Sequence, residues 1–460
     1  MSVVLKSVQS SPARRERPQL HTYQGQELVD RLLRWLLCVF VATFVLEAPL
    51  RWALVVWGFP NALYLRDVIP IGSLTLLLFR PLLTRRWIDP LITVPLCLLG
   101  IHGAVGLALG VAPIQVALGF KLFMYPLYGI AMWPLLADHW TTVLRASAVA
   151  FAVTLFGVIL NFFLGPMLWD GMEYDTIFGT VSASRQWWIS GGIPRLAGLA
   201  RASFNAAMII GITGLLCMVW LRPPWLRLLI AVLAVAGIAA TTSKGMLLAF
   251  PIAAVWLLFD GRFAHILLGR MLVYVLCSVS LALPIGVVLL ELGSGLAPVG
   301  FPNFLFSVWE RFSWMWPSAF DLLPKGVGWV LGGGLGSIGT PQLFGPEPHR
   351  FNAADSLAVL LLVNFGVAGT LYFLLPACTL RRVTQVAHPD QAKAFIALLI
   401  VTYGYGFSIS MVEEPFFALC IGLALGMAAN PGLTAQRRNT RVPERRGSSS
   451  PDPSARATIS

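Results

Sequence analysis

The chain has 460 residues, of which 57% are hydrophobic and only 12% charged, and its mean hydropathy is +0.76. About a quarter of the residues of a soluble globular domain are charged, so this composition excludes one. The net charge of +12 does not indicate a nucleic-acid partner. The cations gather at the two ends of the chain and in short segments between apolar runs, as in membrane proteins.

Apolar runs of roughly 18 or more residues predict transmembrane helices, because lipid leaves backbone groups no partners except each other. The predicted fold class is therefore an all-α polytopic integral membrane protein with about 12 transmembrane helices. In chain order the predicted spans cover residues 32–50, 68–83, 91–109, 114–136, 144–164, 204–221, 226–240, a run ending near 260, 271–292, 356–375, 394–410 and 416–429.

The segments outside the spans divide the chain further. Residues 1–30 form a basic arm and residues 431–460 a tail, and their Ser, Pro and Arg content predicts disorder. Residues 31–430 form the transmembrane domain, with two large loops at about 165–202 and 293–354. Residues 304–320 of the second loop are rich in aromatic side chains, which favours a position along the bilayer interface.

An even number of spans places both termini on one side of the membrane. With the termini in the cytoplasm, 23 of the 33 Lys and Arg residues fall in cytoplasmic segments and nine in outer segments, and Lys121 lies within a span. This bias has the direction that the positive-inside rule requires. Both termini are therefore predicted to be cytoplasmic, and both large loops face outward.

Four outer cations are candidates for binding an anionic substrate. Arg195 and Arg201 precede the span at residues 204–221, Lys244 caps a very short hairpin, and Arg350 closes the second loop. Arginine bonds a phosphate bidentately, lysine acts as a point charge, and the start of a helix adds backbone N–H donors. We expect these four to bind a pyrophosphate. The ordinary alternative is that such cations only reach towards lipid headgroups.

Carboxylates and a histidine supply candidate bases. Asp355 precedes the span at residues 356–375 and is either a helix N-terminal carboxylate or a base directed at an outer cavity, and His349 is a second candidate. Glu173 and Asp175 of the first loop are rival bases, and Glu413 and Glu414 are alternative partners for the cations. No outer loop carries a D-x-D motif and the six cysteines form no C-x-x-C pair, so we expect no metal.

Three short motifs resemble those of the O-antigen ligase and polysaccharide polymerase superfamily. They are Arg195-x-x-Gly198 followed by Phe204-Asn205, then Ser243-Lys244-Gly245, then Asp355-Ser356-Leu357 running to Gly366-Val367-Ala368-Gly369. The family patterns are R-x-x-G…P-N, S-R-G and H-N-x…G-x-x-G. The chain departs from them: the proline is absent, Lys244 replaces an arginine, and Asp355 stands where the ligases carry a histidine.

The resemblance implies a GT-C-like membrane glycosyltransferase of the bacterial inner membrane. Such enzymes pass a glycan from undecaprenyl pyrophosphate to an acceptor on the outer face, with no cofactor. By this resemblance Arg195 and Lys244 would hold the pyrophosphate, and Asp355 or His349 would deprotonate the acceptor. The aspartate in the histidine position favours a polymerase of O-antigen or exopolysaccharide over a ligase. Membrane lipid, a chain-length regulator and export proteins are the partners implied.

Two other functions stay open from the sequence. A transporter or flippase of lipid-linked oligosaccharide needs a polar path across the whole membrane, for which Lys121 is the main candidate. A structural membrane subunit needs no site at all, although the two large aromatic outer loops weigh slightly against it.

Overall fold

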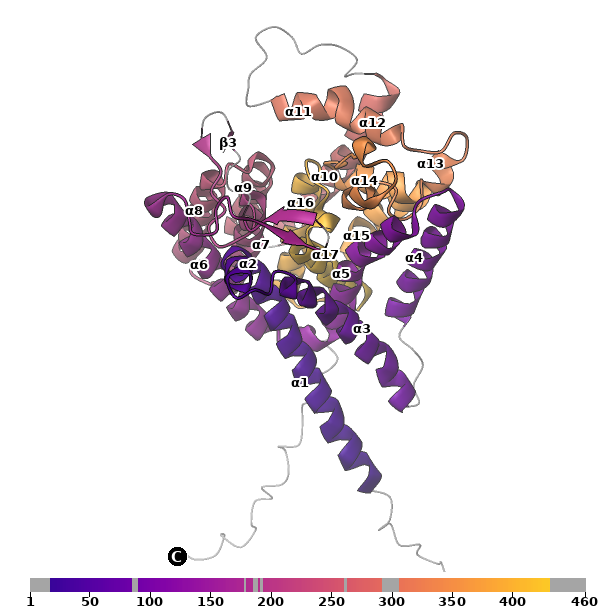
Figure 1. Ribbon diagram of the computed structural model, residues 1–460. Coiled ribbons are helices and arrows are strands. Elements are labelled where there is room, and N and C mark those ends of the chain that lie inside the picture. The colour runs from indigo at the N-terminus through magenta and orange to yellow at the C-terminus, as the bar shows by residue number, and fades with distance from the viewer. Residues whose placement is uncertain are drawn as a thin grey trace, which may run out of the picture.

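The structure is a computed structural model that describes residues 17–84, 90–177, 179–184, 189–190, 193–259, 263–291 and 306–430. The described chain is mostly helical, and six helices in it are long and apolar enough to cross a membrane, or seven if a bent pair is one span. The prediction of an all-α, multi-pass membrane protein is confirmed at this level (Figure 1).

Most helices coincide with the predicted apolar runs. These are α3 (Leu65–Thr84), α4 (Pro90–Ala108), α5 (Pro113–Ala137), α6 (Trp140–Leu164), α7 (Ser203–Trp220), α8 (Pro224–Ala240), α9 (Lys244–Leu258), α10 (Phe263–Leu289), α16 (Pro389–Gly406) and α17 (Pro415–Ala429). The central one is α7, with 83% of its apolar window buried against at most 44% in the other candidate spans. It packs against α6, α8, α9 and α16.

The first predicted span, residues 32–50, is wrong because these residues do not form one straight helix. Helix α1 (Arg17–Val45) and helix α2 (Glu47–Val56) meet at Leu46 with a bend of 87°. A physical reason lies at the bend, where the buried Glu47 carboxylate accepts from Arg51, and a carboxylate is costly to carry on into lipid. The predicted disorder of residues 1–30 is also wrong from Arg17 onward, since α1 begins there. Residues 1–16 and the predicted tail at 431–460 lie outside the described residues.

The predicted span at residues 356–375 is broken as well. Helix α14 (Leu357–Phe365) ends at Gly366, and α15 (Val367–Val386) starts directly after it. Gly366 has a φ of +58°, a left-handed conformation that a side chain would strain, and a Cβ there would clash with the Val330 carbonyl. The break therefore depends on a close approach of the second outer loop to the helix.

That approach is made by a buried glycine-rich stretch, residues 332–336. Its backbone bonds to the end of α14, with the Gly333 N–H donating to the Val363 carbonyl at 2.7 Å and the Gly334 N–H to Asn364 at 3.1 Å. The Leu335 N–H donates to the His102 carbonyl of α4 at 3.1 Å. Backbone N–H groups of the loop therefore bond to the carbonyls that the helix break leaves without a helical partner. Backbone groups inside a membrane need such partners within the protein.

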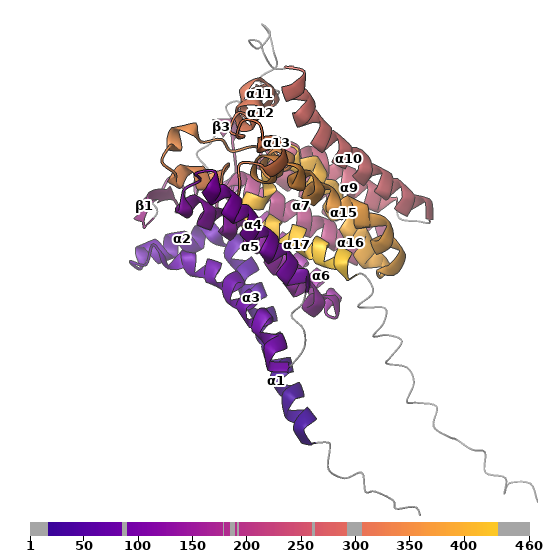
Figure 2. The same ribbon diagram turned by 90° about the vertical axis from the view of Figure 1, so that its right-hand side faces the viewer.

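The two large loops carry short elements that the sequence did not predict. The first loop forms two antiparallel hairpins, β1 (Glu173–Thr176) with β2 (Gly179–Ser182) and β3 (Ile189–Ser190) with β4 (Ile193–Pro194). The second contains α11 (Phe306–Glu310), a π-helical turn at Arg311–Met315, α12 (Trp316–Phe320), α13 (Gly328–Leu331) and 3-10 turns at Thr340–Phe344 and Pro348–Arg350. In Figure 2, β1, α2, α11, α12 and α13 lie along the upper-left side of the molecule.

The aromatic segment at residues 306–320 is not uniformly exposed. Trp316 is fully buried and makes ring contacts with Phe312 and Phe407, while Phe306 and Trp314 are exposed. One set of rings therefore fixes the segment to the helix bundle, and the other faces outward; the interfacial position stays a prediction. The part of this loop before residue 306 lies outside the described residues.

The helices α5 and α17 cross at backbone contact distance. A Cβ on Gly422 would clash with the Pro126 carbonyl oxygen, and a Cβ on Gly129 would clash with the Leu419 carbonyl oxygen. Small residues that let two helix backbones touch are a common way to pack helices in a membrane. This crossing brings the start of α17 next to the segments that form the site described below.

Gly422→Ala is expected to destabilise the protein by about 1–3 kcal/mol, because the added methyl group meets a rigid backbone carbonyl. Thermal unfolding of the detergent-purified protein measures the effect. Gly100→Ala in α4 is the matched control, since a Cβ there meets nothing within 4 Å. Equal melting temperatures for the two variants would contradict this description of the crossing.

Candidate functional site

Residues from four predicted outer segments meet around one tyrosine. Tyr405, near the end of α16, shares a hydrogen bond of 3.1 Å between its hydroxyl and Ser243 Oγ. Arg195, Asp355 and Glu414 are all close enough to Tyr405 to interact with it electrostatically. Segments that lie far apart in the sequence therefore contribute charged groups to one place. We call the residues gathered here the Tyr405 cluster.

The Ser243-Lys244-Gly245 motif packs directly on the end of α16. Lys244 is the first residue of α9, and a Cβ on Gly245 would clash with Ser408 Oγ and with the Tyr405 ring. Only glycine therefore allows the start of α9 to lie this close to residues 405–408. Because its neighbours Ser243 and Gly245 both contact Tyr405, the backbone of Lys244 lies beside the Tyr405 cluster.

The Arg195-x-x-Gly198 motif forms a tight turn before α7. Gly198 has a φ of +60°, its N–H donates to Asn161 Oδ1 at 3.1 Å, and a Cβ on it would clash with the backbone of Gly157 in α6. This turn holds Arg195 against the bundle. Burial lowers the pKa of Arg195, and the nearby Tyr405 acts in the opposite direction. Desolvated arginine binds an anion more strongly than an exposed one, because solvent screens the charge less.

Asp355 is held by an arginine that sequence reasoning did not include in the site. Asp355 Oδ2 accepts a hydrogen bond of 2.8 Å from Arg311 Nη2, which also donates to the Ser408 carbonyl at 3.0 Å. Burial raises the pKa of Asp355, and the positive charge of Arg311 acts in the opposite direction. Arg311 belongs to the π-helical turn of the second loop. Such turns occur often at functional sites.

The alternative role of Asp355 as a helix N-terminal carboxylate is wrong in detail. Ser356 occupies the N-cap position of α14, and its side chain makes no capping hydrogen bond. Ala354 and Asp355 instead adopt left-handed conformations, with φ values of +61° and +41°. Non-glycine residues in this region are strained, and such strain is concentrated at functional sites. The chain is bent here to place the Asp355 carboxylate at Arg311.

Two of the predicted site residues lie elsewhere. His349 and Arg350 are both exposed in a 3-10 turn, and Arg350 pairs with the exposed Glu347 at 2.9 Å. Among the contacts of the described residues, none joins either side chain to Asp355 or Tyr405. The structure brings Arg195, the Lys244 motif and Asp355 together and leaves His349 and Arg350 at the surface.

A second charged group, next to the Tyr405 cluster, was missed from the sequence. At the α1–α2 bend the buried Glu47 accepts from Arg51 Nη2 at 2.7 Å and pairs with Arg66 at 3.1 Å. Arg51 also donates to the Tyr174 hydroxyl at 2.6 Å, which fixes the β1–β2 hairpin to α2. Arg201 interacts electrostatically with Glu47. The only local signal is the pair of Glu47 and Arg51, four residues apart. Glu47 falls inside the predicted first span, and Arg51 directly follows it.

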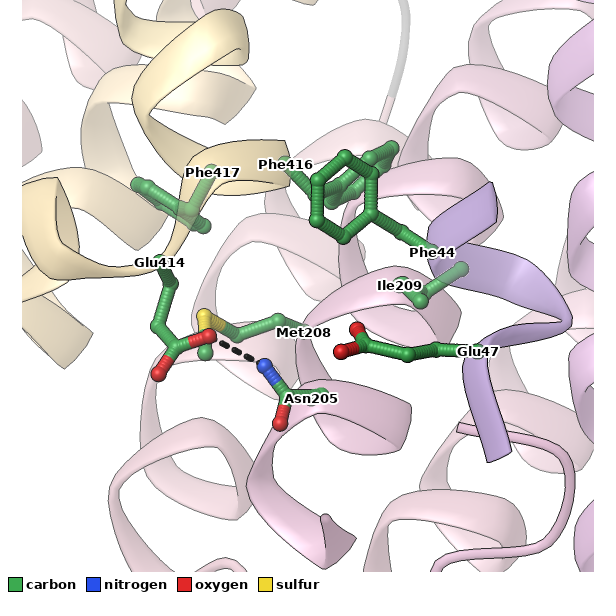
Figure 3. A pocket seen from close by; sticks show the side chains of 8 residues that line it. All are labelled: Phe44, Glu47, Asn205, Met208, Ile209, Glu414, Phe416 and Phe417. Atoms are coloured by element: carbon green, nitrogen blue, oxygen red, sulfur yellow. Dashed lines mark hydrogen bonds between the residues drawn. The ribbon is translucent and has the colours of Figure 1, made fainter. Parts of the chain in front are cut away.

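A small pocket connects the two charged groups. Its walls are formed by residues from the α1–α2 bend, from α7 and from the start of α17: Phe44, Glu47, Asn205, Met208, Ile209, Glu414, Phe416 and Phe417. Figure 3 shows the carboxylates of Glu47 and Glu414 directed towards Asn205 from opposite sides. Asn205 Nδ2 donates to Glu414 Oε2. The Phe204-Asn205 motif therefore places an amide between two carboxylates in a pocket whose other walls are apolar.

The Glu414 carboxyl group, at the start of α17, has a strongly raised pKa. Burial raises the pKa of Glu414 to about 7, although the Asn205 amide and the charge of Arg201 act in the opposite direction. Its neighbour Glu413 faces elsewhere and accepts from the Thr340 N–H and from Ser410. Of the two carboxylates considered as partners for cations, only Glu414 interacts with Arg201. A carboxyl group with a pKa near 7 can exchange a proton at physiological pH.

No known protein family, no curated protein and no solved structure matches this chain. The side chains of the site are therefore the basis for its chemistry. The half-buried Arg195 and Arg201 and the exposed Lys244 can hold a phosphate, and the neighbouring carboxylates can accept a proton.

Proposed function

We propose that this chain is a membrane glycosyltransferase that polymerises or transfers undecaprenyl-pyrophosphate-linked glycan units on the outer face of a bacterial inner membrane. The resemblance of its three motifs to the O-antigen ligase and polysaccharide polymerase superfamily supports this proposal. One observation carries it: Ser243 of the lysine motif hydrogen-bonds to Tyr405, and Arg195 and Asp355 both lie within electrostatic range of that tyrosine. Three short motifs with no common role would have no reason to converge.

The proposed topology has 12 spans and a GT-C-like arrangement. It counts α1, the eight helices from α3 to α10, the broken pair α14–α15 as one, α16 and α17. Both termini are then cytoplasmic, and α2, both large loops and residues 407–414 lie on the outer side. The candidate site lies at this outer end, where a lipid-linked pyrophosphate would present its charged group.

In this proposal the cations bind the leaving group. Arg195, Arg201 and Lys244 hold the pyrophosphate at the start of α7, whose N-terminal N–H groups add further donors. Positive charge fixed at this position stabilises the diphosphate as its bond to the sugar breaks, and such fixed charges are a major source of catalysis. Arg350 is left out of the set, because its side chain is exposed and pairs with Glu347.

The structure weighs against the alternative of a flippase. Lys121, the main candidate for a polar path, pairs with Asp67 near the outer start of α3 at a distance of 2.6 Å. Asp67 also accepts from Tyr125 at 2.9 Å and lies beside Arg66. Lys121 therefore belongs to the outer group of charges around Glu47 and does not mark a route through the inner half of the membrane.

Deleting the gene is expected to stop glycan polymerisation and to leave single lipid-linked repeat units on the outer face of the inner membrane. Those units can be located by labelling with a membrane-impermeant reagent that reacts with sugar. Accumulation on the inner face would contradict the transferase and favour the flippase, and unchanged long glycan would contradict both.

A further inference from the structure

We propose that Glu414, held by Asn205, is the general base that takes the proton of the acceptor hydroxyl. This inference rests on the proposed transferase function and names a residue for a step that the motifs left to Asp355 or His349. It is carried by the pocket between the α1–α2 bend, α7 and α17, in which Glu414 lies at one wall (Figure 3).

The hydrogen bond from Asn205 occupies one oxygen of the Glu414 carboxylate and leaves the other oxygen to accept a proton. Asn205 Nδ2 contacts Oε2, and the other carboxylate oxygen points away from Asn205 in Figure 3. The donor is a neutral amide, which orients the carboxylate without cancelling its charge. Asp355 differs in this respect, because the guanidinium of Arg311 binds its Oδ2 directly at 2.8 Å. An ion-paired carboxylate is a weaker base than one that faces an amide.

The position of Glu414 also suits the proposed leaving group. Arg201, one of the cations assigned to the pyrophosphate, interacts electrostatically with both Glu414 and Glu47. Asn205 lies four residues after Arg201, in the first turn of α7. The proposed base therefore lies against the first turn of α7, where the diphosphate is proposed to bind.

The proposed step balances as a simple displacement. The acceptor hydroxyl oxygen bonds to the anomeric carbon while the bond from that carbon to the pyrophosphate oxygen breaks. The bonding electron pair leaves on undecaprenyl pyrophosphate, whose charge the cations stabilise. The hydroxyl proton moves to the Glu414 carboxylate, and nothing is oxidised or reduced.

The charges that face Glu414 come from every neighbouring element. Glu47 of α2 and the adjacent Glu413 raise the pKa of Glu414, and Arg201 lowers it. Tyr405 of α16 also interacts with Glu414 electrostatically. The base must be deprotonated to act, so transfer in the wild type is expected to fall as the pH drops below about 7.

The test uses membranes containing the full chain and lipid-linked repeat units extracted from the deletion strain. Glu414→Gln is expected to lower the transfer rate by about 10²–10⁴-fold, the usual contribution of a general base, and to abolish the rise in rate around neutral pH. Glutamine still offers Asn205 an acceptor oxygen, so a purely structural role would leave Glu414→Gln active. Glu347→Gln is the control and is expected to keep a rate close to that of the wild type, because Glu347 is an exposed carboxylate that pairs with Arg350 outside the pocket.

The outcomes separate the two proposals. If wild-type membranes do not extend the extracted units, the transferase function itself fails. If they do and Glu414→Gln is as active as the control, Glu414 is not the base. If Glu414→Gln does not accumulate in the membrane, Glu414→Asp decides, because a shorter carboxylate must shift the pH profile, and an unchanged profile overturns the inference.

Discussion

Arg195→Ala and Lys244→Ala are each expected to reduce glycan transfer by about 10²–10³-fold, because each removes a fixed positive charge from the leaving group. The partly buried Arg195 lies at Tyr405, and Lys244 begins α9 beside the same tyrosine. Arg195→Lys is expected to recover only part of the activity, since a lysine keeps the charge but loses the planar fork. The measurement is the length distribution of the glycan made in a deletion strain that carries each variant.

Arg222→Ala is the control for these substitutions. Arg222 is a largely exposed arginine at the opposite end of α7, where it pairs with Asp390 at 3.2 Å. Its loss is expected to leave the glycan unchanged. Variant protein must be present in the membrane at normal levels for the comparison to hold. Full-length glycan from both Arg195→Ala and Lys244→Ala would remove the phosphate-binding role from this site.

Glu47→Ala is expected to destabilise the protein by about 3–5 kcal/mol, the usual result when one partner of a buried ion pair is removed. Glu47 is 4% exposed and binds both Arg51 and Arg66, so its loss takes the carboxylate from the buried Arg51 guanidinium and leaves Arg66 with the more distant Asp67. The measurement is thermal unfolding of the protein purified in detergent.

The chain contains its own matched control for this prediction. Glu27 and Arg31 form the same i,i+4 pair in α1, but their side chains are 63% and 62% exposed. Exposed pairs contribute little, so Glu27→Ala is expected to leave the melting temperature nearly unchanged. Similar melting temperatures for Glu47→Ala and Glu27→Ala would show that the pair at the bend does not hold α2 in place.

Much of the fold could be predicted from the sequence, because lipid imposes one simple rule on long apolar runs. The helices from α3 to α10 lie close to the predicted spans for this reason. Two predictions of the fold that failed concern breaks inside apolar runs, at Leu46 and at Gly366. The only local signal for the bend at Leu46 is the pair of Glu47 and Arg51. The pairing of Glu47 with Arg66 joins residues across a turn that periodicity does not show.

The site was predictable only in part. Arg195, Lys244 and Asp355 stand out as polar residues in short motifs, and the structure brings their segments together at Tyr405. The residues that were missed act through distant partners. Arg311 is one outer cation among several until the fold places it at Asp355. Glu414 is separated from Asn205 by 209 positions, and no local pattern predicts such a contact.

The short segment at residues 407–414 has a consequence for biogenesis. Through Ser408, Glu413 and Glu414 it contacts Arg311, Thr340 and Asn205, which all emerge from the ribosome earlier. During synthesis those three positions must wait for the final helical hairpin, α16 and α17, to insert. A nascent chain that stops before this hairpin would keep most of its spans and none of these three contacts. The site is therefore complete only after the chain has been translated through α16 and α17.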